Sequence, residues 1–337
     1  MRYIKFTLII LIVIVSCSKE KENSNHKPLA NFLYVDALDH FELSDISKDV
    51  DGDVLTPKWF SMCDSIKIIN PQSTNAYFNL PNFSDTNHLR IKLLVFDGHL
   101  SDSIFKDIKL PKNTLERSYG LGINLDSEHS NNDSYNWYFD QMNTGTYSSI
   151  NCGPTSVTMA IKWVNGSFDK TPLDARNTYR SGGGWWYTDD IINYLNRYSV
   201  NNKTINIFDI DSIQRQIDLG NIAILCLDMY YIRSQEKNKW HLDKFYGTSN
   251  KGWGHFIVIK GYKVVDEQVF YEAYDPNSWG AQYNDGTAKG KDRYYRSQDL
   301  DSAVINWWNY AIIISKVNLK SSNGGVDITK ITHKPGL

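Results

Sequence analysis

The chain has 337 residues, of which 41% are hydrophobic, 22% charged and 13% aromatic, and its formal net charge is −2. These fractions are typical of globular proteins and exclude a chain that is disordered throughout. The near-neutral charge, together with the lack of a long basic run, gives no reason to expect a nucleic-acid partner. At this length we expect one large domain or two modest ones.

The N-terminus has the features of a bacterial export signal. Arg2 and Lys5 give the N-terminus a positive charge. The unbroken apolar run that follows, Leu8–Val15, is too short for a membrane span. The stretch ends in Ile-Val-Ser-Cys17, which resembles a bacterial lipobox. The resemblance implies that residues 1–17 are a lipoprotein signal with a lipidated Cys17, and that the protein is anchored in the cell envelope, at the outer membrane or cell surface. An ordinary signal peptide, in which Cys17 has no role, is the alternative.

A polar tether over residues 18–27 leads to a segment, residues 28–112, that has the pattern of a β-sandwich. Apolar and polar residues alternate at 88–95 and at 103–110. Turn signals such as Asp-Gly and Asn-Pro separate these stretches. Short strands with this punctuation predict an all-β sandwich.

Two acidic phrases in this segment, Asp-Val-Asp-Gly-Asp from Asp49 and Val-Phe-Asp-Gly-His from Val95, resemble the paired signatures of bacterial cadherin-like or PKD-like immunoglobulin-fold modules. The resemblance implies an immunoglobulin-like sandwich. The carboxylates of Asp49, Asp51 and Asp53 could hold calcium, because hard cations prefer clustered carboxylate oxygens. The phrase is not an EF-hand loop, since its twelfth position is Phe60. A solvated turn whose aspartates cap the backbone is the alternative that we favour.

Residues 113–134 are rich in Asn, Ser, Gly and Asp and only weakly patterned, so we predict a linker there or a lead-in to the next domain. The domain that follows, residues 135–318, is expected to mix helices and strands, with helices beginning at Cys152 and near Thr188. The expected strands are 222–227, 255–261, 268–274 and 311–317. Residues 319–337 are predicted to be a polar tail.

Three cysteines follow Cys17, so they cannot all pair with one another. Cys152 stands before Gly-Pro-Thr-Ser and a helical apolar pattern, which places it at a helix N-terminus, where the dipole and the unpaired N–H groups stabilise a thiolate. A buried, inert thiol is the alternative, but the polar and small neighbours of Cys152 argue against it. Cys226 lies inside an apolar strand, and we interpret it as a core residue. No His/Cys cluster has the spacing of a zinc site.

A thiolate nucleophile needs a base, and His255 stands directly before a strong strand. His241 competes with it but lies in a sequence typical of a loop. Twenty residues after His255, the strand 268–274 ends at Asp275. If the two strands pair as a hairpin, Asp275 could orient the imidazole and stabilise its charged form. A turn without a catalytic role is the alternative for Asp275.

The phrases Cys152-Gly-Pro-Thr-Ser, Gly-His255-Phe-Ile-Val-Ile-Lys-Gly-Tyr and Tyr-Asp275-Pro, in this order, resemble the bacteriocin-processing (double-glycine-leader) peptidases among the papain-like cysteine peptidases. The resemblance covers about residues 135–318. It implies a papain-like fold with Cys152 as the nucleophile, His255 as general base and acid, and Asp275 as the orienting residue. It also implies a glutamine whose amide binds the oxyanion. Gln141 is the candidate, although eleven residues before Cys152 is farther than the usual spacing.

The sequence therefore predicts an α+β papain-like cysteine peptidase domain preceded by an all-β immunoglobulin-like sandwich. Its expected substrates are peptides or proteins outside the cytoplasm, and no cofactor is required beyond the calcium that the N-terminal module could hold. No phosphate-binding loop or transporter span is found, so leader processing coupled to export is not expected. Two alternatives stay open. One is an acyltransferase or transglutaminase-like enzyme on the same fold, and the other is a non-catalytic surface binding protein.

Overall fold

The chain forms two compact units, which divide between Pro111 and Lys112 in the computed structural model. The structure describes residues 24–64, 66–80, 88–111, 114–207, 209–235 and 240–319. The predicted signal with Cys17, most of the tether and nearly all of the predicted tail lie outside the described residues. Within the described part, no helix is both long enough and apolar enough to pass through a bilayer.

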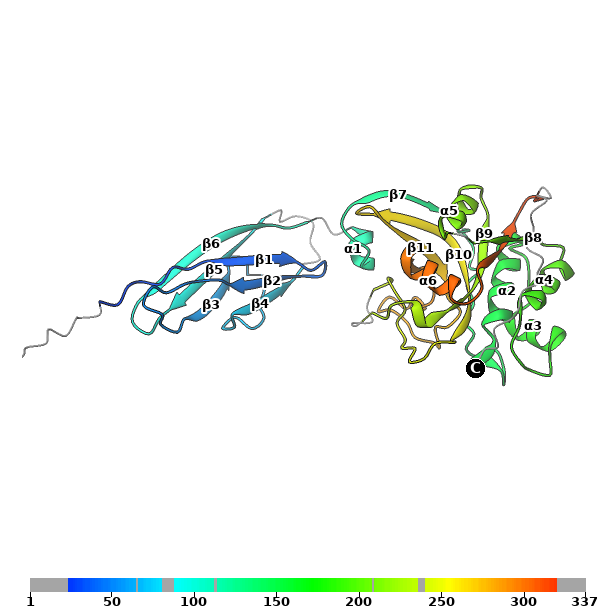
Figure 1. Ribbon diagram of the computed structural model, residues 1–337, viewed down its shortest axis with the longest axis horizontal. Coiled ribbons are helices and arrows are strands. Elements are labelled where there is room, and N and C mark those ends of the chain that lie inside the picture. Colours follow the sequence, from blue (N-terminus) through cyan, green and yellow to red (C-terminus); the bar gives the residue numbers. More distant parts are fainter. Residues whose placement is uncertain are drawn as a thin grey trace, which may run out of the picture. The chain divides into compact units, whose positions relative to one another are not determined.

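The first unit consists of two three-stranded antiparallel sheets around one apolar core (Figure 1). One sheet has the order β1-β2-β4 and the other has the order β3-β5-β6. The strands are β1 (Phe32–Asp36), β2 (His40–Asp45), β3 (Thr56–Ser61), β4 (Asn75–Asn79), β5 (His88–Phe96) and β6 (Ser101–Lys109). Alternate residues of β5 are buried, and the core is centred on Trp59, whose ring meets Phe32 edge to face. The expected pairing of short alternating strands is found, while the immunoglobulin-like assignment stays a prediction.

The second unit contains a seven-stranded antiparallel sheet with helices on both faces (Figure 1). The strand order is β12-β11-β10-β9-β13-β8, and β7 pairs with the far half of β10. The strands are β7 (Leu125–Ser130), β8 (Asn201–Asn206), β9 (Ile222–Asp228), β10 (Gly254–Val265), β11 (Gln268–Tyr274), β12 (Arg293–Arg296) and β13 (Tyr310–Ser315).

The helices divide between the two faces of this sheet because its central strands are apolar on both sides. Ile224 and Cys226 of β9 belong to the core that α2, α3 and α4 cover, whereas Leu225 and Leu227 belong to the core under α5 and α6. The α-helices are α1 (Leu115–Tyr119), α2 (Cys152–Val164), α3 (Pro172–Tyr179), α4 (Thr188–Arg197), α5 (Asp211–Asp218) and α6 (Ser297–Ile305). Two short 3-10 turns, η1 (Ser148–Ile150) and η2 (Met229–Tyr231), complete the unit.

The helices predicted at Cys152 and near Thr188, and the four predicted strands of this unit, are all present. The segment 113–134 holds α1 and β7, and β7 pairs with β10, so the segment is part of the second unit rather than a linker alone. Strand β7 is mostly exposed and carries no apolar alternation, so its sequence lacks the usual strand signal. Backbone pairing with β10 holds it in place, aided by Lys263, whose ammonium bridges Glu116 and Glu128 at 2.7 and 2.6 Å.

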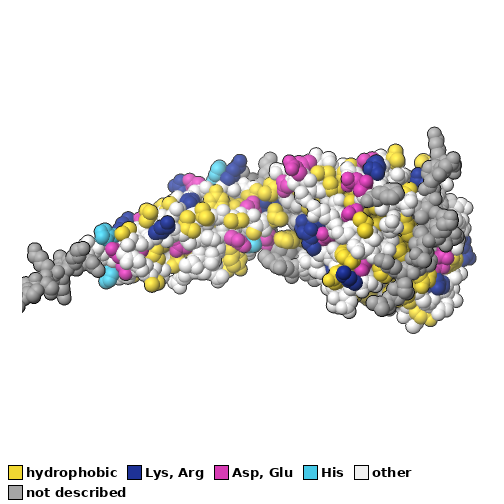
Figure 2. All heavy atoms as spheres, viewed as in Figure 1, with side chains coloured by type: hydrophobic (Ala, Val, Ile, Leu, Met, Phe, Trp, Pro, Cys, Tyr) yellow, Lys and Arg dark blue, Asp and Glu magenta, His cyan; other side chains and the backbone are white. Residues whose placement is uncertain are grey.

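Charged side chains of both signs share the surface. On the face drawn in Figure 2, Lys and Arg lie interspersed with Asp and Glu over both units. Some of them pair, as Arg90 and Asp107 do across neighbouring strands at 2.7 Å. This mixing agrees with the small net charge and differs from the one-sided basic surface of nucleic-acid-binding domains.

Candidate active site

The nucleophile candidate, Cys152, is the first residue of α2 and only 4% exposed. Asn151, directly before it, is fully buried, and both the nitrogen and the oxygen of its side-chain amide form hydrogen bonds. Its amide donates to the carbonyl oxygen of Thr144 at 3.0 Å, and its own side-chain oxygen accepts from Nε of Arg176 at 2.7 Å. Cys152 therefore starts its helix from a backbone position that buried polar contacts fix on two sides.

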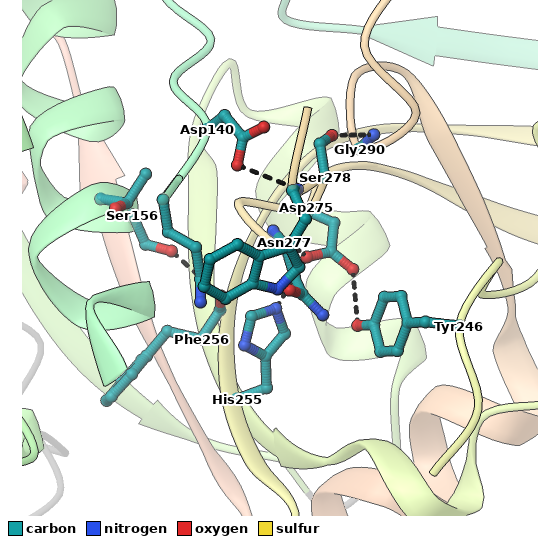
Figure 3. Close-up of polar contacts among 12 residues, drawn as sticks. Asp140, Ser156, Tyr246, His255, Phe256, Asp275, Asn277, Ser278 and Gly290 are labelled. Carbon is teal, nitrogen blue, oxygen red and sulfur yellow. Dashed lines mark hydrogen bonds and ion pairs between the residues drawn. The ribbon is translucent and has the colours of Figure 1, made fainter. Parts of the chain in front are cut away.

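His255 and Asp275 are brought together by the hairpin that the sequence predicts. Strands β10 and β11 pair antiparallel, with Val258 opposite Tyr274, and Asp275 is the first residue after β11. Nε2 of His255 lies 2.7 Å from Oδ1 of Asp275, and the two side chains are 4% and 0% exposed. Figure 3 shows the imidazole pointing at this carboxylate. The contact is buried and lies at the end of the sheet where β10 begins and β11 ends.

The carboxylate of Asp275 accepts three further hydrogen bonds. The backbone N–H of Asn277 donates to Oδ1 at 2.8 Å, and the hydroxyl of Tyr295 donates to Oδ2 at 2.6 Å. The hydroxyl of Tyr246 also donates to Oδ2, at 3.0 Å (Figure 3). Burial raises the pKa of Asp275, but the charge and hydrogen bond of His255 outweigh it, with help from Tyr295 and Asn277, and hold the pKa at about 2. Asp275 is therefore a buried, ionised acceptor.

The imidazole of His255 is held in its charged form. Burial alone lowers the pKa of His255, but the charge and hydrogen bond of Asp275, followed by those of Cys152, outweigh it and raise the pKa to about 10. Because Nε2 contacts Asp275, Nδ1 is the ring nitrogen left for the hydrogen bond with Cys152. Cys152, His255 and Asp275 thus form one chain of contacts, in the order thiol, imidazole, carboxylate.

Gln141 is buried between the segments that carry Cys152 and Asp275. Its side-chain amide donates to the carbonyl oxygen of Ser148, four residues before the nucleophile, at 3.1 Å, and its backbone N–H donates to the carbonyl of Pro276 at 2.8 Å. One hydrogen of that amide remains, because the –NH₂ group has two. The unusual spacing to Cys152 arises from a loop that includes η1. The oxyanion role of Gln141 stays a prediction.

The support for Asp275 comes from residues that the sequence analysis did not single out. Tyr246 and Tyr295 are far apart in the sequence and carry no local signal of their role. Gly290 closes the back of the site: its N–H donates to Ser278 Oγ at 2.6 Å, and a side chain there would collide with the Asp275 carbonyl. The Asp-Pro-Asn turn could have indicated Asn277, because an Asp side chain often accepts from the N–H two residues on.

Two other candidates of the sequence have different surroundings. The ring of His241 stacks between Tyr119 and Tyr283, at centroid distances of 4.0 and 4.1 Å, and its Nδ1 contacts the carbonyl of Asp292. Burial lowers the pKa of His241. Cys226 is a buried free thiol whose pKa burial raises far above its ordinary value, so it is neutral.

A cavity of about 320 Å³ opens beside the nucleophile. Cys152, Cys226 and the residues on either side of His255 line it together with a group of indole rings. A volume of this size is at the lower end of ligand pockets, which span about 300–1,000 Å³. It suits one side chain with its neighbouring backbone.

The acidic phrase of the first unit lies at an exposed turn. Ligand oxygens of Asp49, Asp51 and Asp53 all lie within 4.8 Å of one another. The same carboxylates also have protein donors: Asp49 Oδ1 accepts from the N–H of Asp51 at 2.8 Å, and Asp51 accepts from the N–H and Nδ1 of His26 at 2.6 and 2.9 Å. These bonds are those of a self-capped turn, and calcium at this place stays a prediction.

Comparison with known proteins agrees with the geometry of the second unit. Residues 135–302 match the Peptidase_C39 like family. Among solved structures, one assigned as a C39-like peptidase from Bacillus anthracis covers 58% of this chain and 100% of its own length, with 14% identity and a TM-score of 0.38. A nucleoside hydrolase-related hypothetical protein from Saccharophagus degradans, associated with carbohydrate metabolism, covers 25% of this chain with 23% identity and a TM-score of 0.23.

The chain spans about a quarter, 26%, of the length of the Saccharophagus protein. No curated protein matches the sequence. The family match covers the segment that carries Cys152, His255 and Asp275. It therefore supports a papain-like peptidase domain, similar to the Peptidase_C39 like family, over residues 135–302.

Proposed function

We propose that this protein is a cysteine peptidase that hydrolyses peptide bonds of peptides or proteins outside the cytoplasm. The observation that carries the proposal is the buried contact of His255 with Asp275, in which the pKa of the same imidazole is also raised by its interaction with Cys152, the first residue of α2. A merely structural His–Asp pair would not need a free thiol at its far end. The family match over the same segment supports the same reaction class.

In the proposed reaction, His255 takes the proton of Cys152, and the thiolate attacks the carbonyl carbon of the substrate, forming a C–S bond and an oxyanion. The N–H of Cys152 and the remaining amide hydrogen of Gln141 are the donors proposed for this oxyanion. His255 then gives its proton to the leaving amine as the C–N bond breaks. Water attacks the acyl-enzyme, returns a proton to His255 and releases the acid as the C–S bond breaks.

The first unit and the N-terminus supply the proposed location. We infer a lipid anchor at Cys17 from the lipobox-like sequence, and an immunoglobulin-like module from the two sheets and the paired acidic phrases. In chain order, the module would then lie between the proposed anchor and the peptidase unit. Labelling with a palmitate analogue tests the anchor. Lipid is expected on the native protein and not on the Cys17→Ser variant, and equal labelling would reject it.

The peptidase proposal is tested with a peptide library incubated with the purified protein and with its Cys152→Ala variant. Cleavage by the native protein and a loss of about 10⁶-fold in the variant are expected, which is the loss on removing the nucleophile of another acyl-transfer triad. Cys226→Ala is the matched control, since it removes the other thiol of the same cavity. Undiminished cleavage by Cys152→Ala would overturn the proposal. Products joined to an added amine in place of water would assign an acyltransferase.

A further inference from the structure

The walls of the cavity beside Cys152 are aromatic. Trp186, Trp308 and Phe256 are 2–5% exposed and form its floor, whereas Trp185 and Trp253 are 41% and 45% exposed and form its rim. These side chains come from three segments, which precede α4, begin β10 and precede β13. Monomeric proteins seldom leave several indoles at one opening unless a ligand covers them.

Two glycines bring the indole rings close to the reacting residues. A Cβ on Gly254, the neighbour of His255, would lie 2.5 Å from the ring of Trp307. One on Gly153, the neighbour of Cys152, would lie 2.7 Å from the Cβ of Trp186 and 3.4 Å from its ring. Only glycine permits these approaches without a shift of the rings. The aromatic walls therefore begin one residue away from both the nucleophile and the base, so a group in the cavity is next to the scissile bond.

The chemistry of the cavity selects one class of group. Its volume of about 320 Å³ fits one large side chain, and its lining is mostly indole and phenyl surface, which favours apolar groups and above all aromatic ones. The Nε1–H of Trp186 is buried and has no hydrogen-bond partner among the described residues, so a bound group could supply an acceptor. A glycine would leave this space empty.

We propose that this cavity is the subsite for a large aromatic or aliphatic side chain of the substrate, adjacent to the scissile bond. The proposal rests on the peptidase function and gives it a substrate class. It also separates this protein from peptidases that cut after a double glycine. The burial of one phenyl ring in such a site corresponds to several methylene groups, each of which changes kcat/KM by about 10-fold or more.

The test compares peptides that differ at one position near the cleavage site, with Phe, Leu, Gly or Asp there. We expect kcat/KM to be at least about 10²-fold higher for Phe than for Gly at one such position. In the variants Trp185→Ala and Trp253→Ala this preference should fall by about 10-fold, while cleavage of the Gly peptide persists. Both side chains are partly exposed, so the variants are expected to fold. Trp279→Ala is the control, because Trp279 is equally exposed but lies outside the cavity lining.

The outcomes separate the two proposals. If the library is not cleaved at all, the peptidase function fails. If peptides are cleaved but Gly or Asp is preferred at every position, the function stands and the subsite is rejected. The subsite would also be rejected if the aromatic preference were as strong in Trp185→Ala and Trp253→Ala as in the control Trp279→Ala.

A second observation concerns a buried cation behind the nucleophile. Arg176 of α3 is 1% exposed, and its Nε donates to Asn151, the residue before Cys152. Its Nη1 donates to the carbonyls of Arg180 and Gly184 at 3.2 and 3.1 Å, while Nη2 is buried without a partner among the described residues. No described carboxylate forms an ion pair with it, since the nearby Asp190 pairs with Arg180.

Burying a guanidinium without a paired carboxylate costs desolvation free energy, so a functional role would explain why Arg176 is there. Several charged and titratable groups lie around the thiol and Arg176. His255, Cys226, Lys251 and Tyr187 lie near the thiol, and Arg180, Asp190 and Tyr147 act on Arg176. We infer that Arg176 is a positioning residue, which fixes Asn151 and adds positive charge that favours the thiolate of Cys152. Burial and then the charge of Arg180 lower the pKa of Arg176, and attraction to Cys152, followed by Asp190 and Tyr147, acts in the opposite direction.

The inference is tested by the pH dependence of alkylation of Cys152 with iodoacetamide, in a background with Cys63 and Cys226 replaced by Ala. Arg176→Gln can still donate to Asn151 but has no charge, and its alkylation midpoint should move to higher pH. Arg176→Lys keeps the charge and should show the native midpoint. If the Arg176→Gln variant does not fold, the Arg176→Lys variant alone tests the inference, and its alkylation midpoint must equal that of the native protein. A shift for Lys, or none for a folded Gln variant, would contradict the inference.

Discussion

One histidine–aspartate contact in the first unit can be compared with one in the second, because the two are almost equally short. Nδ1 of His26 lies 2.9 Å from Asp51, and Nε2 of His255 lies 2.7 Å from Asp275. The side chains of the first pair are 59% and 29% exposed, whereas those of the second are 4% and 0% exposed. The second imidazole also contacts a free thiol.

The difference shows that burial and surroundings, not the His–Asp distance, decide what such a pair can do. Water screens the exposed pair, and backbone and side-chain hydrogen bonds from His26 lower the pKa of Asp51. In the buried pair, each group holds the other in its charged form, and the two tyrosine hydroxyls have no other acceptor described for them. In this pair, unlike the exposed one, the imidazole is held in its protonated form and can act as the general acid of the proposed reaction.

The largest predicted effect comes from removing each imidazole in turn. His255→Ala should reduce peptide cleavage by about 10⁶-fold, the loss for the histidine of another acyl-transfer triad. His26→Ala should leave cleavage unchanged, since its ring has only an exposed carboxylate as partner. Steady-state kinetics on one cleaved peptide measures both. A loss below about 10-fold in His255→Ala would show that the buried pair is structural.

Neutralising the two carboxylates is the next comparison. Asp275→Asn keeps the shape but removes the charge that opposes the effect of burial on His255, so the pKa of this histidine should fall. The imidazolium is needed to protonate the leaving amine, and the alkaline limb of kcat/KM should therefore move from near pH 10 to lower pH. The rate itself should fall by up to about 10⁴-fold. Asp51→Asn is the control, and an unmoved alkaline limb in Asp275→Asn would refute the ion pair.

The same variant should change the pH dependence of stability. The folded-state pKa of His255 is raised from 6.5 to about 10, so its contribution is complete below pH 6.5 and is lost as the pH rises through 10. The pKa of Asp275 is lowered from 3.8 to about 2, so its contribution is present above pH 3.8 and is lost as the pH falls through 2. Thermal unfolding should thus show the greatest difference between native and Asp275→Asn protein between about pH 4 and 6.5.

A smaller effect is expected from a glycine behind the buried pair. Gly290→Ala would push a methyl group into the Asp275 carbonyl and the Tyr138 hydroxyl, and overpacking of this kind costs about 1–3 kcal/mol. Gly247→Ala is the matched control, because its Cβ would meet nothing within 4 Å. Urea unfolding measures both. Equal urea midpoints for Gly290→Ala and Gly247→Ala would mean that the backbone around Gly290 shifts to accept the methyl group and does not fix the position of Asp275.

These comparisons also mark what a sequence can predict. The apolar helix after Cys152 and the strands that bring His255 to Asp275 follow from local patterns, and so does the order of the three residues. Tyr246 and Tyr295 could not be predicted, because their role depends on how distant loops fold onto one hairpin. Strand β7 was missed for a related reason: its partner β10 supplies the structure, and its own residues are polar and exposed.

The smallest effect is predicted for calcium at the exposed aspartates. Asp49 already accepts two backbone N–H groups and Asp51 accepts two donors from His26, so part of the oxygen set that calcium would need is occupied by protein hydrogen bonds. Adding millimolar calcium or removing it with EDTA should therefore leave the unfolding temperature of the protein unchanged. The triple variant with Asn at 49, 51 and 53 should respond identically to the native protein. A calcium-dependent rise in the native protein that the triple variant lacks would instead assign a metal site to this turn, and the exposed His–Asp pair would then be the group that the metal displaces.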